Sequence, residues 1–209
     1  MIMKQFFGIA VLSTFATLFA SGPLVAQDEY RAGDGFWWGV GAGVGVGKVA
    51  CSLCNAGHNI APAAQLRLGG VLGRTFLFGV EANGFYRTGR DENGNALLRE
   101  VMGGAAAVLY WYPNPAGGRY FFKGGFGPFF YRISEANVPA DQEAAAPISS
   151  TAFSGHFGVG YELPVTSSIM FVPYVNFTGT AYANLTREES TVADANLTLI
   201  QIGLGFTWR

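Results

Sequence analysis

The last twelve residues of the chain, Thr198–Arg209, alternate between large apolar side chains and small or polar ones. Side chains of a strand point to opposite faces with a period of two, so an extended segment here has one apolar face and one polar face. A strand with lipid on one side and a narrow polar interior on the other has this pattern. The apolar face carries Ile200, Ile202, Leu204, Phe206 and Trp208, and the other face carries Gln201, Gly203, Gly205 and Thr207.

The composition agrees with such a strand. The chain is 50% hydrophobic and only 13% charged, which is about half of the usual charged fraction. Beyond the first 26 residues, no apolar run reaches the length of about 20 residues that a membrane helix requires. Alternation dilutes the apolar residues instead, and a closed β-barrel is the other structure that can span lipid. The net charge of −1 and the lack of a basic patch argue against nucleic-acid binding.

The N-terminus has the features of a secretory signal peptide. Lys4 precedes an apolar core over Phe6–Ala20, and Ala26 offers a small residue at a cleavage site. An uncleaved membrane anchor is the alternative, but the core is shorter than a full membrane span. We therefore expect residues 1–26 to direct export and to be removed, and residues 27–209 to form one domain.

Eight segments of the mature chain have strand periodicity, and their connections alternate between long and short. This asymmetry predicts an all-β fold: an eight-stranded, antiparallel, up-and-down transmembrane β-barrel with long outer loops and short periplasmic turns. The soluble alternative, a lipocalin-like barrel, would need the apolar face inside. The expected strands are 35–47, 63–72, 75–87, 99–112, 119–132, 151–163, 169–182 and 198–209.

The first of these strands has glycine at every second position from Gly39 to Gly47. We expect this face to point inward, where glycine relieves crowding in a small barrel. A nucleotide-binding loop is excluded, because no Gly-x-Gly-x-x-Gly opens a helix and Gly47-Lys48 is followed by Val49. The sequence predicts no cofactor.

The whole mature chain resembles the small OmpA/OmpX-type barrels of the bacterial outer membrane, and Thr198–Arg209 resembles their closing strand. The resemblance implies a monomer in the outer membrane of a Gram-negative-type bacterium, in contact with membrane lipid and lipopolysaccharide. It also implies that the assembly machinery recognises aromatic residues of the closing strand, here Phe206 and Trp208. Arg209 follows them as the last residue, which departs from the aromatic terminus of that family. Tyr110-Trp111-Tyr112 suits an aromatic girdle at a membrane interface.

A loop between the first two strands contains Cys51 and Cys54, with His58 four residues further on. An exported chain meets an oxidising compartment, so we expect a disulfide between the two cysteines. A metal site is the alternative, but three ligands lack the fourth that a closed zinc site needs. No metal is therefore predicted.

Ser154 and His156 lie on the same inward face of the sixth strand. Some outer-membrane barrels are lipid-modifying enzymes that use serine and histidine, so a catalytic dyad is one interpretation. The nearest inward carboxylate on that strand, Glu162, lies about 20 Å along it, beyond hydrogen-bond reach. A hydrogen-bonded interior histidine is the favoured interpretation, and no catalytic residue is predicted.

Four inward charges are expected to form ion pairs between neighbouring strands. Arg67 and Glu81 lie six residues before Gly73 and seven after Arg74, so a hairpin places them opposite each other. Lys123 and Glu162 lie near the periplasmic ends of neighbouring strands and should also pair. Separate hydration is the alternative, but a filled eight-stranded interior leaves little water for lone charges.

Eight strands leave an interior just wide enough for side chains. We therefore predict a non-enzymatic envelope scaffold or surface-contact protein that acts through its outer loops. A narrow channel or carrier for a small solute and a lipid-modifying enzyme are the alternatives. The sequence does not identify the ligand or the surface partner of the loops.

Overall fold

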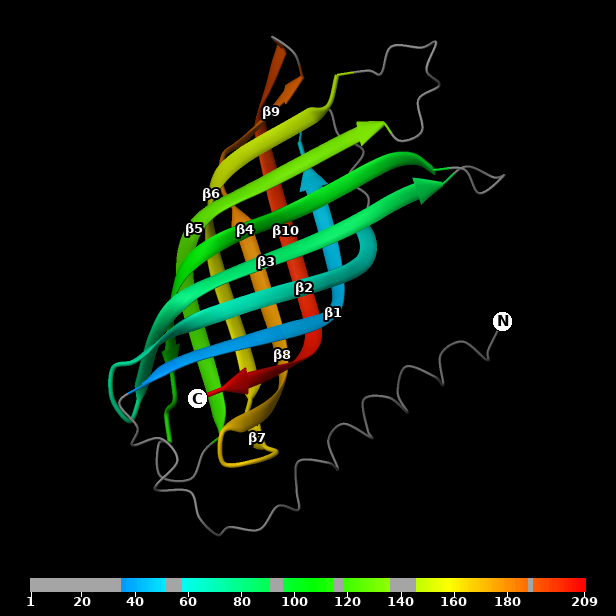
Figure 1. Ribbon diagram of the computed structural model, residues 1–209. Helices are drawn as coiled ribbons and strands as arrows, with labels where there is room; N and C mark the ends of the chain where they lie inside the picture. Colours follow the sequence, from blue (N-terminus) through cyan, green and yellow to red (C-terminus); the bar gives the residue numbers. More distant parts are fainter. Residues whose placement is uncertain (1–34, 52–57, 91–95, 115–118, 136–145, 188–189) are drawn as a thin grey trace, which may run out of the picture.

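The computed structural model describes residues 35–51, 58–90, 96–114, 119–135, 146–187 and 190–209. Within this part of the chain ten strands form one antiparallel sheet that closes on itself, because β1 pairs with β10 (Figure 1). No helix there is both long and apolar enough to cross a membrane. The strands are β1 (Phe36–Ala50), β2 (His58–Val71), β3 (Phe76–Arg90), β4 (Ala96–Trp111), β5 (Tyr120–Glu135), β6 (Ile148–Tyr161), β7 (Leu163–Pro164), β8 (Ile169–Thr180), β9 (Ala183–Arg187) and β10 (Ser190–Trp208).

Eight strand positions make up the wall of the barrel. β1 to β6 follow in order, and β8 and β10 complete the ring. β8 and β9 both lie between β6 and β10, since both pair with β10 and both bond to β6. The strand is interrupted between β8 and β9 at Tyr182, whose φ of 66° lies in the left-handed region. The predicted eight-stranded antiparallel barrel is confirmed.

The two ends of the barrel differ. The end with residues 72–75, 112–114 and 162–168 also holds Gly35, Arg119 and the C-terminus, and we call it the turn end. The opposite end, with β9 and the last residues of β1, β3 and β5, we call the loop end (Figure 1). At the turn end the strand boundaries agree with the prediction to within one or two residues, except that β6 stops at Tyr161 and the short β7 follows separately.

At the loop end most strands are longer than predicted, although β8 ends at Thr180, two residues before its predicted end. β3 continues to Arg90 and β5 continues to Glu135. The expected loop over 183–196 contains β9, which pairs with the first residues of β10. The reason is that these extensions carry polar side chains on their outward face, such as Thr88 and Ser134, whereas inward residues such as Leu185 are still buried. Their sequence therefore lacks the large apolar outward residues that mark a lipid-facing strand.

Large apolar side chains point outward along every wall strand, as predicted. Examples on β3 and β5 are Phe76, Phe78, Phe122 and Phe126, all exposed. From Phe76 to Tyr86 the outward row on β3 spans about 33 Å of strand, which at the usual barrel tilt gives a height of about 25 Å. That height matches the apolar band of an outer-membrane barrel. The barrel wall is therefore built to face lipid.

The interior is filled in three layers. An apolar cluster at the loop end includes Phe85, Met102 and Phe129, all fully buried. A second apolar cluster at the turn end includes Trp37 and Phe121. Between them lies a layer of buried polar and charged side chains, and on β3 the three layers follow one another as Leu77, Glu81 and Phe85. The polar layer comprises Gln65, Arg67, Glu81, Asn83, Lys123, Ser154, His156, Asn176, Thr178 and Gln201.

Glycine on the inward face of β1 makes room for these side chains. A Cβ at Gly41 would lie 2.8 Å from the Tyr174 ring and 2.9 Å from Gln65 Nε2. A Cβ at Gly45 would lie 3.0 Å from the Phe85 ring. The predicted inward glycine face is confirmed, and its role is to let large side chains from other strands cross the lumen.

We therefore expect Gly41→Ala to lower the free energy of unfolding by about 1–3 kcal/mol, because it overpacks the interior. Gly124→Ala is the matched control, since a Cβ there meets nothing within 4 Å, and it should change stability by no more than about 0.5 kcal/mol. Urea unfolding of the refolded proteins in micelles measures both values. Equal effects of the two substitutions would show that the glycine face is not needed for packing.

Candidate functional site

The centre of the polar layer is an ion pair between Glu81 on β3 and Lys123 on β5. Lys123 Nζ lies 2.6 Å from Glu81 Oε1 and 2.5 Å from Oε2, and both side chains are 3% exposed. Tyr110 on β4 donates its hydroxyl to Glu81 Oε2 at 2.9 Å. Asn176 on β8 donates to Gln65 Oε1 at 2.7 Å and lies 3.4 Å from Glu81 Oε1. Side chains from three other strands, β4, β5 and β8, therefore meet at the Glu81 carboxylate.

The sequence predicts an ion pair between Arg67 and Glu81. The predicted β2–β3 register is confirmed, but the predicted ion pair is wrong. Arg67 and Glu81 are directly opposite each other in the β2–β3 pairing. Arg67 instead donates through Nη2 to Thr207 Oγ1 on β10, at 2.6 Å. It reaches β10 across β1 because Gly39 lies in between, where a Cβ would stand 2.8 Å from Arg67 Nε.

The expected pair of Lys123 with Glu162 is also wrong. Lys123 is opposite Gly158 on β6, four residues before Glu162, which corresponds to about 13 Å along a strand. Glu162 follows the end of β6 and binds the guanidinium of Arg209 at 2.5 Å. Tyr112 donates to the same carboxylate oxygen at 2.7 Å. The C-terminal residue thus has a structural role at the turn end, which the sequence pattern did not indicate.

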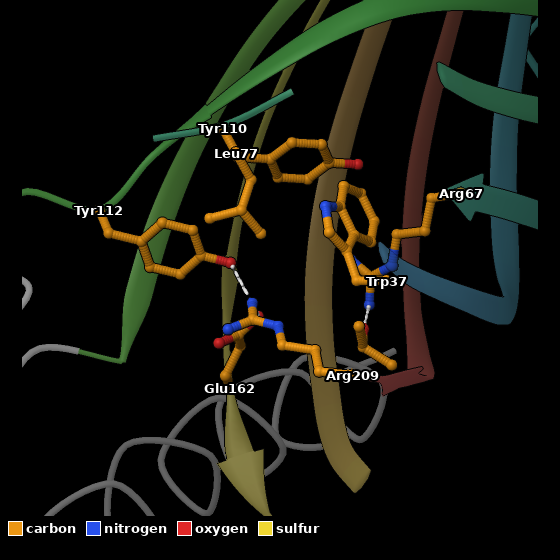
Figure 2. Close-up of a pocket in the computed structure, with 8 residues that line it drawn as sticks. Trp37, Arg67, Leu77, Tyr110, Tyr112, Glu162 and Arg209 are labelled. Atoms are coloured by element: carbon orange, nitrogen blue, oxygen red, sulfur yellow. Dashed lines mark hydrogen bonds and ion pairs between the residues drawn. The ribbon is translucent and has the colours of Figure 1, made fainter. Parts of the chain in front are cut away.

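A small pocket lies at the turn end beside this second ion pair (Figure 2). Figure 2 shows the Tyr112 hydroxyl and the Arg209 guanidinium pointing toward each other, with Glu162 next to them. Trp37 and Arg67 line the other side. The space that a water-sized molecule can occupy there is about 10 Å³, which is room for about one water molecule.

Ser154 and His156 are brought together with Thr178 and Asn83 in the polar layer. The Ser154 hydroxyl donates its hydrogen to the carbonyl of Gly127 at 2.9 Å. Its 2.9 Å contact with His156 Nε2 therefore requires the imidazole to donate. Nδ1 is then the acceptor for Thr178 Oγ1 at 3.1 Å and Asn83 Nδ2 at 3.3 Å. A neutral imidazole in this tautomer has no lone pair aimed at the serine, so the arrangement fits an interior hydrogen-bond network.

Two interior tyrosines were assigned to the wrong face by the sequence pattern. Tyr110 and Tyr112 are 2% and 1% exposed and point inward, whereas Trp111 between them is 45% exposed. Only Trp111 can therefore belong to the expected girdle, where it packs against Phe122. Strict alternation along β4 would have given this result, because Ala106 and Val108 before them also face inward.

The closing strand has the predicted faces. Phe206 is exposed and packs on Phe171, and Trp208 stacks on Trp38 with ring centroids 4.3 Å apart. These contacts join the last strand to both of its neighbours. Recognition of Phe206 and Trp208 by the assembly machinery stays a prediction.

Some predicted features lie outside the described residues. Cys54 falls in the segment 52–57, so its disulfide with Cys51 stays a prediction. Cys51 itself is half-buried, and His58 is exposed at the start of β2. The signal peptide over residues 1–26 also lies outside the described part of the chain.

A closed barrel with an apolar outer belt and a polar inner layer defines the class of small outer-membrane β-barrels. Among solved structures, the chain is similar to Neisserial surface protein A (NspA), at 13% identity and a TM-score of 0.51, over 83% of this chain and 96% of that one. It is also similar to Ail, the attachment invasion locus protein of Yersinia pestis, at 11% identity and a TM-score of 0.53, over 82% of this chain and 98% of that one. At these identities the likeness concerns the fold alone. No protein-family model matches the chain, and no curated protein matches it.

The burial of the Glu81–Lys123 ion pair predicts how much each partner contributes to the stability of the barrel. Glu81→Ala and Lys123→Ala should each lower the free energy of unfolding by about 3–5 kcal/mol, because each leaves an uncompensated buried charge. The double variant should cost clearly less than the sum of the two. Urea unfolding in micelles, arranged as a double-mutant cycle, measures this coupling.

The control cycle combines Glu81→Ala with Arg67→Ala. Its coupling should be the smaller of the two, since the described contacts of Arg67 go to Thr207. A larger coupling for Arg67 than for Lys123 would contradict the observed pairing.

Proposed function

We propose that the protein is a closed outer-membrane barrel that acts as an envelope scaffold or surface-contact protein through its loop end. The observation that carries this proposal is the three-layered filling of the interior. Two apolar clusters lie above and below a polar layer in which the charges of Glu81 and Lys123 are paired with each other. A solute crossing the barrel would have to displace packed aromatic side chains twice and the ion pair once.

The extended loop end supports the surface role. β3, β4 and β5 run beyond the outward apolar row, and β9 pairs with β10 at the same end (Figure 1). Paired strands present side chains on a rigid support, as binding sites require. NspA is named as a surface protein and Ail is named for attachment and invasion. Because fold alone does not define function, we give these names less weight than the closed interior.

The two alternative functions have less support. A narrow channel or carrier requires a continuous polar path, which the two apolar clusters oppose. A lipid-modifying enzyme requires a serine that a lipid can reach. Ser154 is 2% exposed, and its hydroxyl is engaged by Gly127 and His156.

The purified barrel in a planar bilayer should give no discrete conductance steps, because the interior is filled. Replacing Met102 and Phe129 at the loop end by alanine should leave the bilayer non-conducting, since the cluster at the turn end still closes the lumen. Stable, solute-selective conductance of the unmodified protein would overturn the closed-interior proposal in favour of a channel.

The surface role is measured separately in intact cells. An epitope inserted after Arg187 should be accessible to antibody, whereas the same epitope inserted after Gly73 at the turn end should be accessible only after lysis. The reverse pattern would place the turn end outside and rule out the proposed role of the loop end.

A further inference from the structure

Two arginines at the loop end point outward, toward the surroundings of the barrel. Arg99 on β4 and Arg132 on β5 are both exposed. Their chain neighbours Glu100 and Tyr131 are buried inside, so strand alternation directs both arginines outward. Arg132 is opposite Val101 and Arg99 is opposite Ser134, which makes the arginines diagonal neighbours. Side chains in this relation start about 7–8 Å apart, within reach of one another when they are long.

The level of this pair follows from the outward apolar row. On β5 itself the outward row of exposed aromatic residues runs from Tyr120 to Phe130, and Arg132 is the next outward residue. Arg132 therefore lies at the upper edge of the belt, whose height is about 25 Å. Arg99 lies two residues further out, a step of about 7 Å along the strand. The two guanidinium groups thus stand at the height of lipid headgroups.

The charges of these two arginines are not balanced within the described residues. Inside the barrel near the same level, Arg87 pairs with Glu100 at 3.5 Å, and Asn59 donates to the same carboxylate at 2.8 Å. No carboxylate of the described residues forms such a pair with Arg99 or Arg132. Two positive charges at this distance repel each other, so an anion from outside the chain would relieve the repulsion.

Hydroxyl groups surround the arginines on the same outward face. Thr88 donates to the Tyr86 hydroxyl at 3.3 Å, and Thr88 is opposite Arg99. Ser134 is the partner of Arg99 on the other side. Directly below, Phe130 is exposed toward the lipid. The patch therefore combines two guanidinium groups and three hydroxyls above an aromatic surface.

We propose that Arg99 and Arg132 bind a phosphate group of an outer-leaflet lipid, with the acyl chain packed on Phe130. A guanidinium offers two parallel N–H donors to a phosphate, and basic clusters at a membrane surface select anionic headgroups. The height of the patch and the apolar surface below it identify the source as a lipid and not free phosphate. The proposal rests on the proposed placement in the outer membrane with the loop end outward, and it specifies the lipid contact of that surface.

Native mass spectrometry of the refolded barrel in neutral detergent, titrated with bisphosphorylated lipid A, tests the proposal. Arg99→Gln/Arg132→Gln should weaken binding about tenfold or more. Lys48→Gln/Arg187→Gln is the matched control, because it removes two positive charges from the same end but from other parts of the wall. The control should bind within about twofold of the unmodified protein, as expected if binding depends on local contacts. A heat-modifiable gel shift checks that each variant is folded.

Two further measurements distinguish a lipid phosphate from free phosphate. A lipid A analogue without phosphates should bind the unmodified barrel as weakly as lipid A binds the double variant, and millimolar inorganic phosphate should not displace lipid A. Equal binding by all variants would overturn the proposal, and so would displacement by inorganic phosphate. These measurements do not involve conductance, so a channel result would contradict the proposed function without deciding the lipid site.

Discussion

Every backbone N–H and C=O group that lies in lipid must find its hydrogen-bond partner inside the sheet, and the rest of the structure depends on this requirement. The β1–β10 pairing from Trp38↔Trp208 to Ala50↔Asn196 meets it, because it leaves no open edge in the wall. Closure in turn gives each strand one face toward lipid and one toward a narrow interior. The exposed Phe126 and Phe157 and the buried Lys123 and His156 follow from that division.

The narrow interior then requires that large side chains share space across the barrel. Glycine provides the space: Gly39 lets Arg67 pass over β1, and a Cβ at Gly158 would contact the Lys123 side chain. Long polar side chains can therefore bond to strands that are not their neighbours. Glu81 on β3 meets Lys123 on β5, two strands away, instead of the Arg67 directly opposite. The interior is thus held by contacts across the lumen as well as by pairing along the wall.

Local alternation was enough to predict the strand number, the facing of β1 and β10 and the register that puts Arg67 opposite Glu81. The partners of the charges could not be predicted in this way, because they depend on the reach of side chains over glycines on intervening strands. The extension of β5 to Glu135 and the β9 strand were missed for a different reason. Beyond the lipid the outward face carries polar side chains such as Asn184 and Ser134, so the alternation that marks a lipid-facing strand is lost while the backbone pairing continues.

Tryptophan fluorescence with brominated lipids tests most directly which face of the barrel contacts lipid. The variants keep a single tryptophan and carry phenylalanine at the other three positions. Trp111 is 45% exposed on the outer wall, and Trp37 is 2% exposed inside the barrel. In bilayers with bromine near the headgroup end of the acyl chains, Trp111 emission should be strongly quenched and Trp37 emission should be nearly unchanged. Quenching of Trp37 equal to or greater than that of Trp111 would contradict a barrel with its apolar face on lipid and a filled interior.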